Sequence, residues 1–217
     1  MRANITCSVK GLYAVTPDIA DTDLLLIKIE AALQGGANIL QYRNKSANHK
    51  LQTQQARELL PLCRQYNVPL IINDSVKICL TLDADGVHLG ADDGNLADVR
   101  ARIGLNKILG ASCYNSFDLA LAAQQAGASY VAFGACFASN TKPNAPVINL
   151  DLYSDLFTRA NTELKIPTVA IGGITLNNAA QVIAMGANAI AVVSGLFATD
   201  DIAKTSQQLS HLFKFKH

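Results

Sequence analysis

Three segments of the chain share one pattern: QGGANIL at 34–40, QAGASYV at 125–131 and MGANAIA at 185–191. In each, the end of a helix passes through a Gly-Ala turn into a short apolar run. Glycine readily adopts the left-handed backbone conformation that closes a helix, and a short apolar run is typical of a parallel strand covered on both faces. The repeat therefore predicts a chain built from successive βα units.

Five further apolar runs bounded by turn residues predict the remaining strands, at 12–16, 70–72, 86–89, 107–111 and 168–171. Amphipathic patterns between them predict helices, for example at 21–33 and 200–213. Eight strands alternating with helices predict an α/β protein, a single (β/α)8 TIM barrel that forms one catalytic domain over residues 1–217. A doubly wound open sheet has the same local signals and stays an alternative at this point.

The composition excludes several classes of partner. Lys and Arg number 18 against 17 Asp and Glu, with no polybasic run, which disfavours nucleic acid. No apolar run approaches the about 18 residues that span a bilayer, and the N-terminal residues lack a signal-peptide pattern, so we expect no membrane contact and a cytoplasmic location. The five cysteines include no C-x-x-C pair, and we expect them to be reduced and mostly buried.

Charged side chains follow three of the predicted strands, at the barrel end where this fold builds its active sites. Gln41, Arg43 and Lys45 follow the second strand on one side of it, and an Arg fork with a Lys charge suits a phosphate or diphosphate. Asp74 and Asp93 follow the third and fourth strands. Because Mg²⁺ usually takes one or two carboxylates together with waters and phosphate oxygens, these two could share one ion.

Each of these groups also has a purely structural interpretation. The basic run could be a solvated loop, Asp74 could cap the helix that starts near Val76, and Asp93 could be a turn residue before Gly94. A histidine at the end of a strand is usually a core residue whose hydrogen bonds are made within the protein, so we assign no role to His88.

Strands seven and eight carry a second signal, in Gly172-Gly173 and Ser194-Gly195. Loops after these two strands form the recurrent phosphate site of this barrel, because bare backbone N–H groups converge there. The long polar loop at 138–149 could cover a site. Two phosphate regions make two phosphorylated substrates the expected ligands.

These strand ends together resemble the thiamine-phosphate synthase family. The similarity runs over roughly residues 11–198, in seven motifs that follow the family's order. They are LYAVT at 12–16, LQYRNK at 40–45, IIND at 71–74, GVHLG at 86–90, YVAFG at 130–134, TK at 141–142 and IGGI at 171–174.

The resemblance implies a transferase of thiamine biosynthesis that condenses an aminopyrimidine methyl diphosphate with a thiazole phosphate, giving thiamine phosphate and pyrophosphate. It implies that the pyrimidine diphosphate is bound by Gln41, Tyr42, Arg43, Asn44, Lys45, Asn73, Ser112 and Lys142. The thiazole phosphate would be bound by Ser139, Asn140, Thr141, Gly173, Val193 and Ser194, and the cofactor Mg²⁺ by Asp74 and Asp93. The implied catalytic residues are Arg43, Lys45, Ser112 and Lys142.

Two other functions stay open, a thiazole tautomerase-like isomerase and a non-catalytic thiazole-phosphate binder. Retention of the diphosphate and metal residues together favours the synthase. The chain departs from the family's usual residues at Ala91, Tyr114, Ala138 and Ser139, which bears on efficiency and loop closure. The oligomeric state is undetermined, with a homo-oligomer as one alternative.

Overall fold

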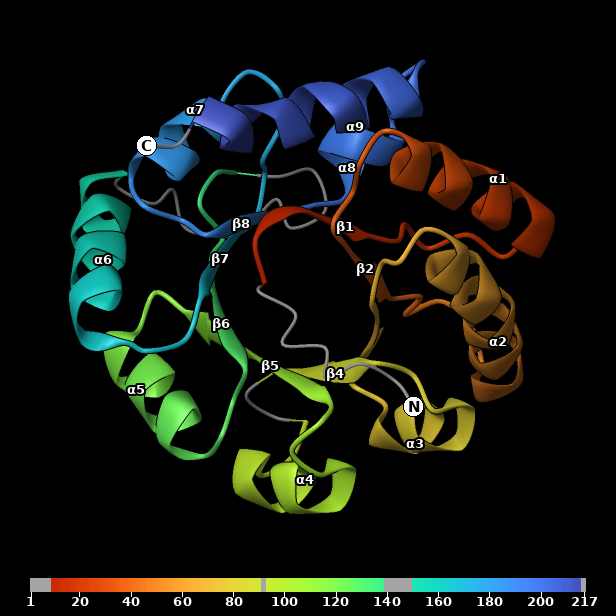
Figure 1. Ribbon diagram of the computed structural model, residues 1–217, viewed down its shortest axis with the longest axis horizontal. Helices are drawn as coiled ribbons and strands as arrows, with labels where there is room; N and C mark the ends of the chain where they lie inside the picture. The colour runs from red at the N-terminus through yellow and green to blue at the C-terminus, as the bar shows by residue number, and fades with distance from the viewer. Residues whose placement is uncertain (1–8, 91–92, 139–149, 216–217) are drawn as a thin grey trace.

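The chain folds into a closed barrel of parallel strands ringed by helices (Figure 1), seen in a computed structural model that describes residues 9–90, 93–138 and 150–215. The strands are β1 (Gly11–Val15), β2 (Ile39–Tyr42), β3 (Leu70–Asn73), β4 (Gly86–Leu89), β5 (Ile108–Tyr114), β6 (Tyr130–Phe133), β7 (Thr168–Ile171) and β8 (Ala189–Val192). Each pairs in parallel with the next, and β1 pairs with β8. The closed order confirms the predicted barrel and rules out the doubly wound sheet.

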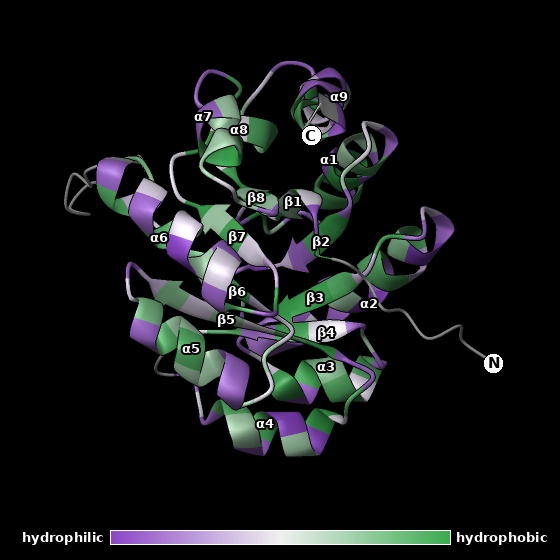
Figure 2. Ribbon diagram, turned by 60° about the vertical axis from the view of Figure 1, so that its left-hand side comes forward, coloured by the Kyte–Doolittle hydropathy of each residue, from purple (hydrophilic) through white to green (hydrophobic). Residues whose placement is uncertain are grey.

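A helix follows every strand on the outside of the barrel. The helices are α1 (Thr22–Gln34), α2 (His49–Gln65), α3 (Val76–Leu82), α4 (Leu96–Ile103), α5 (Phe117–Gln125), α6 (Leu150–Glu163), α7 (Ala179–Ala184), the short α8 (Ser194–Phe197) and α9 (Ile202–His211), with a 3-10 turn at Leu212–Phe215. In Figure 2, α4, α5 and α6 carry alternating hydrophobic and hydrophilic bands, as amphipathic helices do. None of the helices in the described ranges is long and apolar enough to cross a membrane.

Local sequence signals explain where these elements begin and end. Asp21, Asn48 and Ser116 each accept a hydrogen bond from a backbone N–H of the first turn of the following helix, which satisfies a donor that the helix itself cannot. At the other end, the glycines of the three Gly-Ala turns, Gly36, Gly127 and Gly186, have φ of 96°, 87° and 113°. The left-handed turn proposed from the repeat is therefore confirmed.

The hydrophobic core has two parts. The larger lies between the barrel and the helices, and the smaller fills the barrel interior with Val9, Tyr13, Val15, Ile39, Ile71, Ile108, Tyr130, Ala132, Val169, Ala189 and Ala191. This division is expected for a parallel barrel, whose strands are covered on both faces. Cys63, Cys79, Cys113 and Cys136 are buried free thiols, as predicted, whereas Cys7 lies outside the described residues.

Candidate active site

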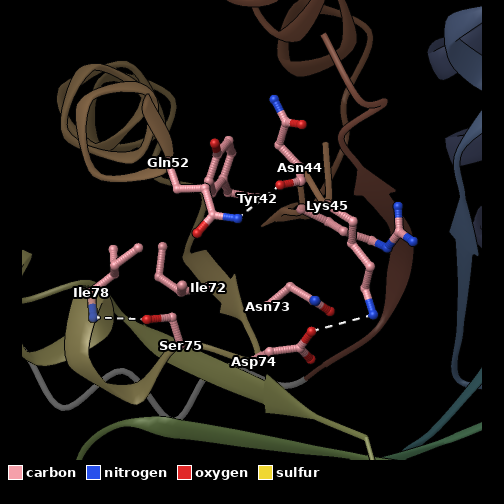
Figure 3. Close-up of a pocket in the computed structure, with 10 residues that line it drawn as sticks. Tyr42, Asn44, Lys45, Gln52, Ile72, Asn73, Asp74, Ser75 and Ile78 are labelled. Carbon is pink, nitrogen blue, oxygen red and sulfur yellow. Dashed lines mark hydrogen bonds and ion pairs between the residues drawn. The ribbon is translucent and has the colours of Figure 1, made fainter. Parts of the chain in front are cut away.

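A pocket of about 270 Å³ opens where β2 and β3 end (Figure 3). It is lined by Tyr42, Arg43, Asn44, Lys45, Gln52, Ile72, Asn73, Asp74, Ser75 and Ile78. The two strand ends come together because β2 and β3 pair in parallel, with Tyr42 opposite Ile72. The structure therefore brings together the basic and acidic groups that the sequence placed after these two strands.

The basic loop is held by a carboxylate that sequence reasoning missed. Asp18, in the loop after β1, lies 3.3 Å from Arg43 Nη1, and its Oδ1 also accepts a hydrogen bond from the Lys45 backbone N–H at 3.0 Å. Thr16 Oγ1 donates to the Arg43 carbonyl oxygen and accepts from the Arg43 N–H. The only signal for Asp18 in the sequence is its position just after a strand, which many loop residues share.

Two of the implied pyrimidine residues turn their polar atoms away from the pocket. The Tyr42 hydroxyl donates to Gln55 Oε1, and Asn44 Nδ2 donates to the same oxygen and to the Ile19 carbonyl. Asn44 is 3% exposed, and its Oδ1 accepts a hydrogen bond from the Ala47 backbone N–H in the same loop. These bonds tie the loop to α2, so Tyr42 and Asn44 shape the pocket wall.

Lys45 and Asp74 form a charged pair in the pocket, and Asp93, which is not one of the residues that line the pocket, acts on Asp74. Lys45 Nζ lies 3.4 Å from Asp74 Oδ2, and Figure 3 shows the lysine reaching across to the carboxylate beside Asn73. Burial, and then the hydrogen bond to Asp93 and its charge, raises the pKa of Asp74 above its usual range, while Lys45 acts in the opposite direction. The Asn73 side chain makes no hydrogen bond to any other described residue, which leaves its amide available to a ligand.

The alternative interpretation of Asp74 as a helix cap is wrong. Ser75 is the N-cap of α3, and its hydroxyl accepts from the Ile78 N–H at 3.2 Å. Asp74 instead has φ of 61°, a left-handed conformation that Asp tolerates better than most residues. The interpretation of Asp93 as a turn residue is correct, because Asp93 Oδ2 accepts a hydrogen bond from the Gly90 N–H at 2.8 Å.

The donor set at this pocket fits a hard divalent cation. The charge of Asp93 raises the pKa of Asp74, and a cation shared by the two carboxylates would relieve that repulsion. Among the described residues, no group of three or more His, Cys, Asp and Glu side chains lies close enough to hold a metal ion. Two carboxylates suit Mg²⁺, which completes its octahedron with waters and phosphate oxygens.

Gln41 and Ser112 sit at the inner surface of the barrel, joined through its interior. Gln41 bonds to Tyr13, and Ser112 bonds to His88, which in turn bonds to Tyr130. Burial lowers the pKa of His88 to about 4, so its imidazole is neutral at pH 7. His88 is thus a buried core histidine with both ring nitrogens hydrogen-bonded, as predicted from the sequence.

The ends of β7 and β8 form a second region suited to an anion. Gly173 has φ of 62°, and a Cβ on it would lie 2.5 Å from the Ala138 carbonyl oxygen. A Cβ on Gly195 would lie 2.2 Å from the Ile174 carbonyl oxygen, so the start of α8 packs directly on the loop after β7. Within the described part of the chain, the backbone N–H groups of Gly173, Ser194 and Gly195 have no hydrogen-bond acceptor. Unpartnered backbone N–H groups at strand ends can bind a phosphate.

Four implied site residues cannot be placed. Ser139, Asn140, Thr141 and Lys142 lie outside the described residues, as does Ala91. Val193, by contrast, precedes α8 directly and packs against the barrel interior.

The barrel and its strand-end groups define a class: a (β/α)8 barrel protein with a charged pocket after β2 and β3 and with unpartnered backbone N–H groups after β7 and β8. Sequence comparison narrows this class. A model of the family described as thiamine monophosphate synthase matches residues 12–196. The chain therefore belongs to the thiamine-phosphate synthase family, whose members are transferases of thiamine biosynthesis.

Individual relatives agree with this placement. The thiamine-phosphate synthase of Methylobacillus flagellatus is 53% identical over 205 residues, covering 94% of this chain and 96% of that protein. The thiamine-phosphate synthase of Chromobacterium violaceum is 48% identical, covering 94% and 97%. Among solved structures, thiamine phosphate pyrophosphorylase from Pyrococcus furiosus has a TM-score of 0.82 at 33% identity, covering 94% of this chain and 95% of that one.

Proposed function

We propose that this protein is a Mg²⁺-dependent thiamine-phosphate synthase that joins an aminopyrimidine methyl diphosphate to a thiazole phosphate, releasing pyrophosphate. The observation that carries the proposal is the ion pair of Lys45 and Asp74 at the ends of β2 and β3, with Asp93 acting on Asp74, together with the unpartnered N–H groups after β7 and β8. One region suits a diphosphate with its cation and the other a monophosphate. Two phosphorylated substrates fit two such regions.

The reaction breaks the bond between the pyrimidine methylene carbon and the diphosphate oxygen, and the thiazole nitrogen then bonds to that carbon. Lys45 and Arg43 balance the charge that develops on the leaving diphosphate, and the free amide of Asn73 donates to it. Mg²⁺ held by Asp74 and Asp93 would supply further charge neutralisation. Such a reaction depends on positioning and electrostatics and requires no protein nucleophile.

Lys142 is proposed as a further cation for the diphosphate, and Ser139, Asn140 and Thr141 as thiazole phosphate ligands, on the family resemblance alone. Gly173, Val193 and Ser194 would complete the thiazole phosphate site. We also propose a cytoplasmic location, which suits the buried free thiols.

The charged pocket separates this proposal from the two alternatives. An isomerase acting on the thiazole phosphate, or a protein that only binds it, has no use for a lysine beside two crowded carboxylates. The thiazole region alone would serve either of them.

Crystals soaked separately with each substrate, in the presence of Mg²⁺, test the assignment. We expect the diphosphate between Lys45 and Asp74, with a cation on Asp74 and Asp93, and the thiazole phosphate on the N–H groups of Gly173 and Ser194. A diphosphate bound at the β7 and β8 ends, or no binding of the pyrimidine diphosphate, would contradict the proposal.

A further inference from the structure

A chain of hydrogen bonds crosses the barrel interior and connects two residues of the proposed pyrimidine site. Gln41 Nε2 donates to the Tyr13 hydroxyl at 2.9 Å, and the hydroxyls of Tyr13 and Tyr130 lie 2.7 Å apart. The Tyr130 hydroxyl lies 2.9 Å from His88 Nδ1, and His88 Nε2 lies 2.9 Å from Ser112 Oγ. The five residues come from five different strands, so only the closed barrel assembles them.

A glycine on β5 leaves room for this chain of hydrogen bonds inside the barrel. Gly110 on β5 pairs with His88 on one side and Tyr130 on the other. A Cβ at Gly110 would lie 2.3 Å from the Tyr130 hydroxyl oxygen and 2.5 Å from His88 Nδ1. Glycine at this position therefore allows the histidine and the tyrosine to meet.

Every member of the chain is neutral at neutral pH. Burial raises the pKa of the Tyr13 and Tyr130 phenols, and burial lowers the pKa of His88. Each phenol therefore carries one proton to donate, and the imidazole carries one proton on one of its two nitrogens.

The direction of the chain then follows from the Gln41 amide. Because Gln41 Nε2 donates to Tyr13, the proton of Tyr13 is left for Tyr130, and the proton of Tyr130 is left for His88 Nδ1. His88 must then carry its own proton on Nε2 and donate it to Ser112 Oγ. The hydroxyl proton of Ser112 remains, and it has no acceptor among the described residues.

We propose that Tyr13, Tyr130 and His88 are positioning residues, which fix Ser112 as a hydrogen-bond donor and Gln41 Oε1 as an acceptor toward the substrate ring. This pattern is complementary to a ring with an exocyclic amino donor and a ring-nitrogen acceptor. It rejects the corresponding oxo ring, which offers an acceptor and an N–H in their place. The assignment of a ring to these two residues rests on the proposed function.

Coupling between the two ends gives the chain its selectivity. The side-chain amide of an isolated glutamine can rotate by half a turn, which exchanges its donor and its acceptor, and can therefore bind either kind of ring. Here the same turn would require Tyr13 and Tyr130 to reverse their hydroxyls and the His88 proton to move from Nε2 to Nδ1. A ring of the wrong pattern must therefore reverse the whole chain or leave buried polar groups unpaired.

The protonated nitrogen of His88 tests the direction without any substrate. The protein contains four histidines, so ¹⁵N spectra of histidine-labelled protein can be assigned to His88 by comparison with His88→Gln. We expect the proton on Nε2, with Nδ1 unprotonated. A proton on Nδ1, or exchange between both nitrogens, would overturn the proposal.

In Gln41→Glu, a carboxylate can only accept, so the proton of His88 should move to Nδ1. An unmoved proton in the folded variant would show that Gln41 does not set the direction.

Binding of two diphosphates, with an amino and an oxo pyrimidine ring, tests the selectivity in case Gln41→Glu fails to fold. We expect the wild-type protein to prefer the amino ring, and Tyr130→Phe to reduce that preference about tenfold or more, because unpaired polar groups penalise the wrong ring. Tyr153→Phe is the matched control: Tyr153 is fully buried and donates to the Ala135 carbonyl, outside the chain. An unchanged preference in Tyr130→Phe would overturn the proposal. If neither diphosphate binds, the proposed function fails, while the His88 proton still reports the direction.

Discussion

Lys45 and Asp74 form an ion pair across the ends of two neighbouring strands, with Lys45 Nζ 3.4 Å from Asp74 Oδ2. The two side chains are 58% and 32% exposed, and an ion pair at such a surface contributes only about 0–1 kcal/mol to stability. Both groups can therefore exchange this contact for a ligand at little cost. In the proposed function, the lysine would turn to the diphosphate and the carboxylate to Mg²⁺.

Asp74→Asn removes the charge and keeps the shape and the left-handed backbone, which Asn tolerates. We expect turnover to fall by about tenfold or more and the Mg²⁺ concentration for half-maximal rate to rise. Stability should hold, because Ser75 caps α3. Ser75→Ala is the comparison, and it should cost about 1 kcal/mol of unfolding free energy. Equal Mg²⁺ dependence in Asp74→Asn and the wild type would refute the assigned metal ligand.

Asp93→Ala should also lose most turnover while the protein stays folded. The variant removes the second carboxylate and one loop hydrogen bond, to the Gly90 N–H. Asp98, in the first turn of α4, is a carboxylate with no proposed part in metal binding, so Asp98→Ala should keep normal turnover. Steady-state rates with circular dichroism of each variant check this. Near-normal turnover of Asp93→Ala would rule out its role at the metal.

Gly173→Ala should weaken binding of the thiazole phosphate. The added methyl group would meet the Ala138 and Phe137 carbonyl oxygens and displace the loop after β7. We expect KM for that substrate to rise about tenfold or more, with KM for the pyrimidine diphosphate little changed. Gly104→Ala is the matched control, because Gly104 also has positive φ but faces open space. It should lower stability by about 1–3 kcal/mol and leave both KM values unchanged. A shift in the pyrimidine KM alone would contradict the assignment.

His88 makes stability depend on pH. The unfolded chain binds a proton on this residue near pH 6.5, whereas the folded protein binds it only near pH 4, so stability falls as pH decreases through that window. The residue's contribution to this loss is about 3 kcal/mol by pH 4. Urea unfolding at a series of pH values should therefore show a shallower pH dependence for His88→Gln than for the wild type. Parallel curves for the two proteins would mean that His88 is not buried neutral.

The barrel could be predicted because its signals are local. A Gly-Ala turn followed by an apolar run, as at 185–191, indicates a βα unit without knowledge of the rest of the chain. The position of Asp74 and Asp93 after neighbouring strands likewise needs only the strand order. The N-cap of α3 could not be assigned from the sequence, because Asp74 and Ser75 both suit the start of this helix and only the structure distinguishes them.

Contacts set by barrel closure could not be predicted. The Tyr13 and Tyr130 hydroxyls meet although the residues are 117 positions apart, and a one-residue change of register would turn either side chain out of the barrel. Asp18 is similar, because its contact with Arg43 depends on the packing of two loops from different strands. Such long-range contacts carry no signal in a single sequence.

Pyrophosphate release tests the central claim most directly. Pure protein supplied with the pyrimidine diphosphate, the thiazole phosphate and Mg²⁺ should release pyrophosphate and form thiamine phosphate in equal amounts, and omission of either substrate or of Mg²⁺ should abolish product formation. Absence of pyrophosphate release from the complete mixture, or full activity after metal removal, would contradict the account.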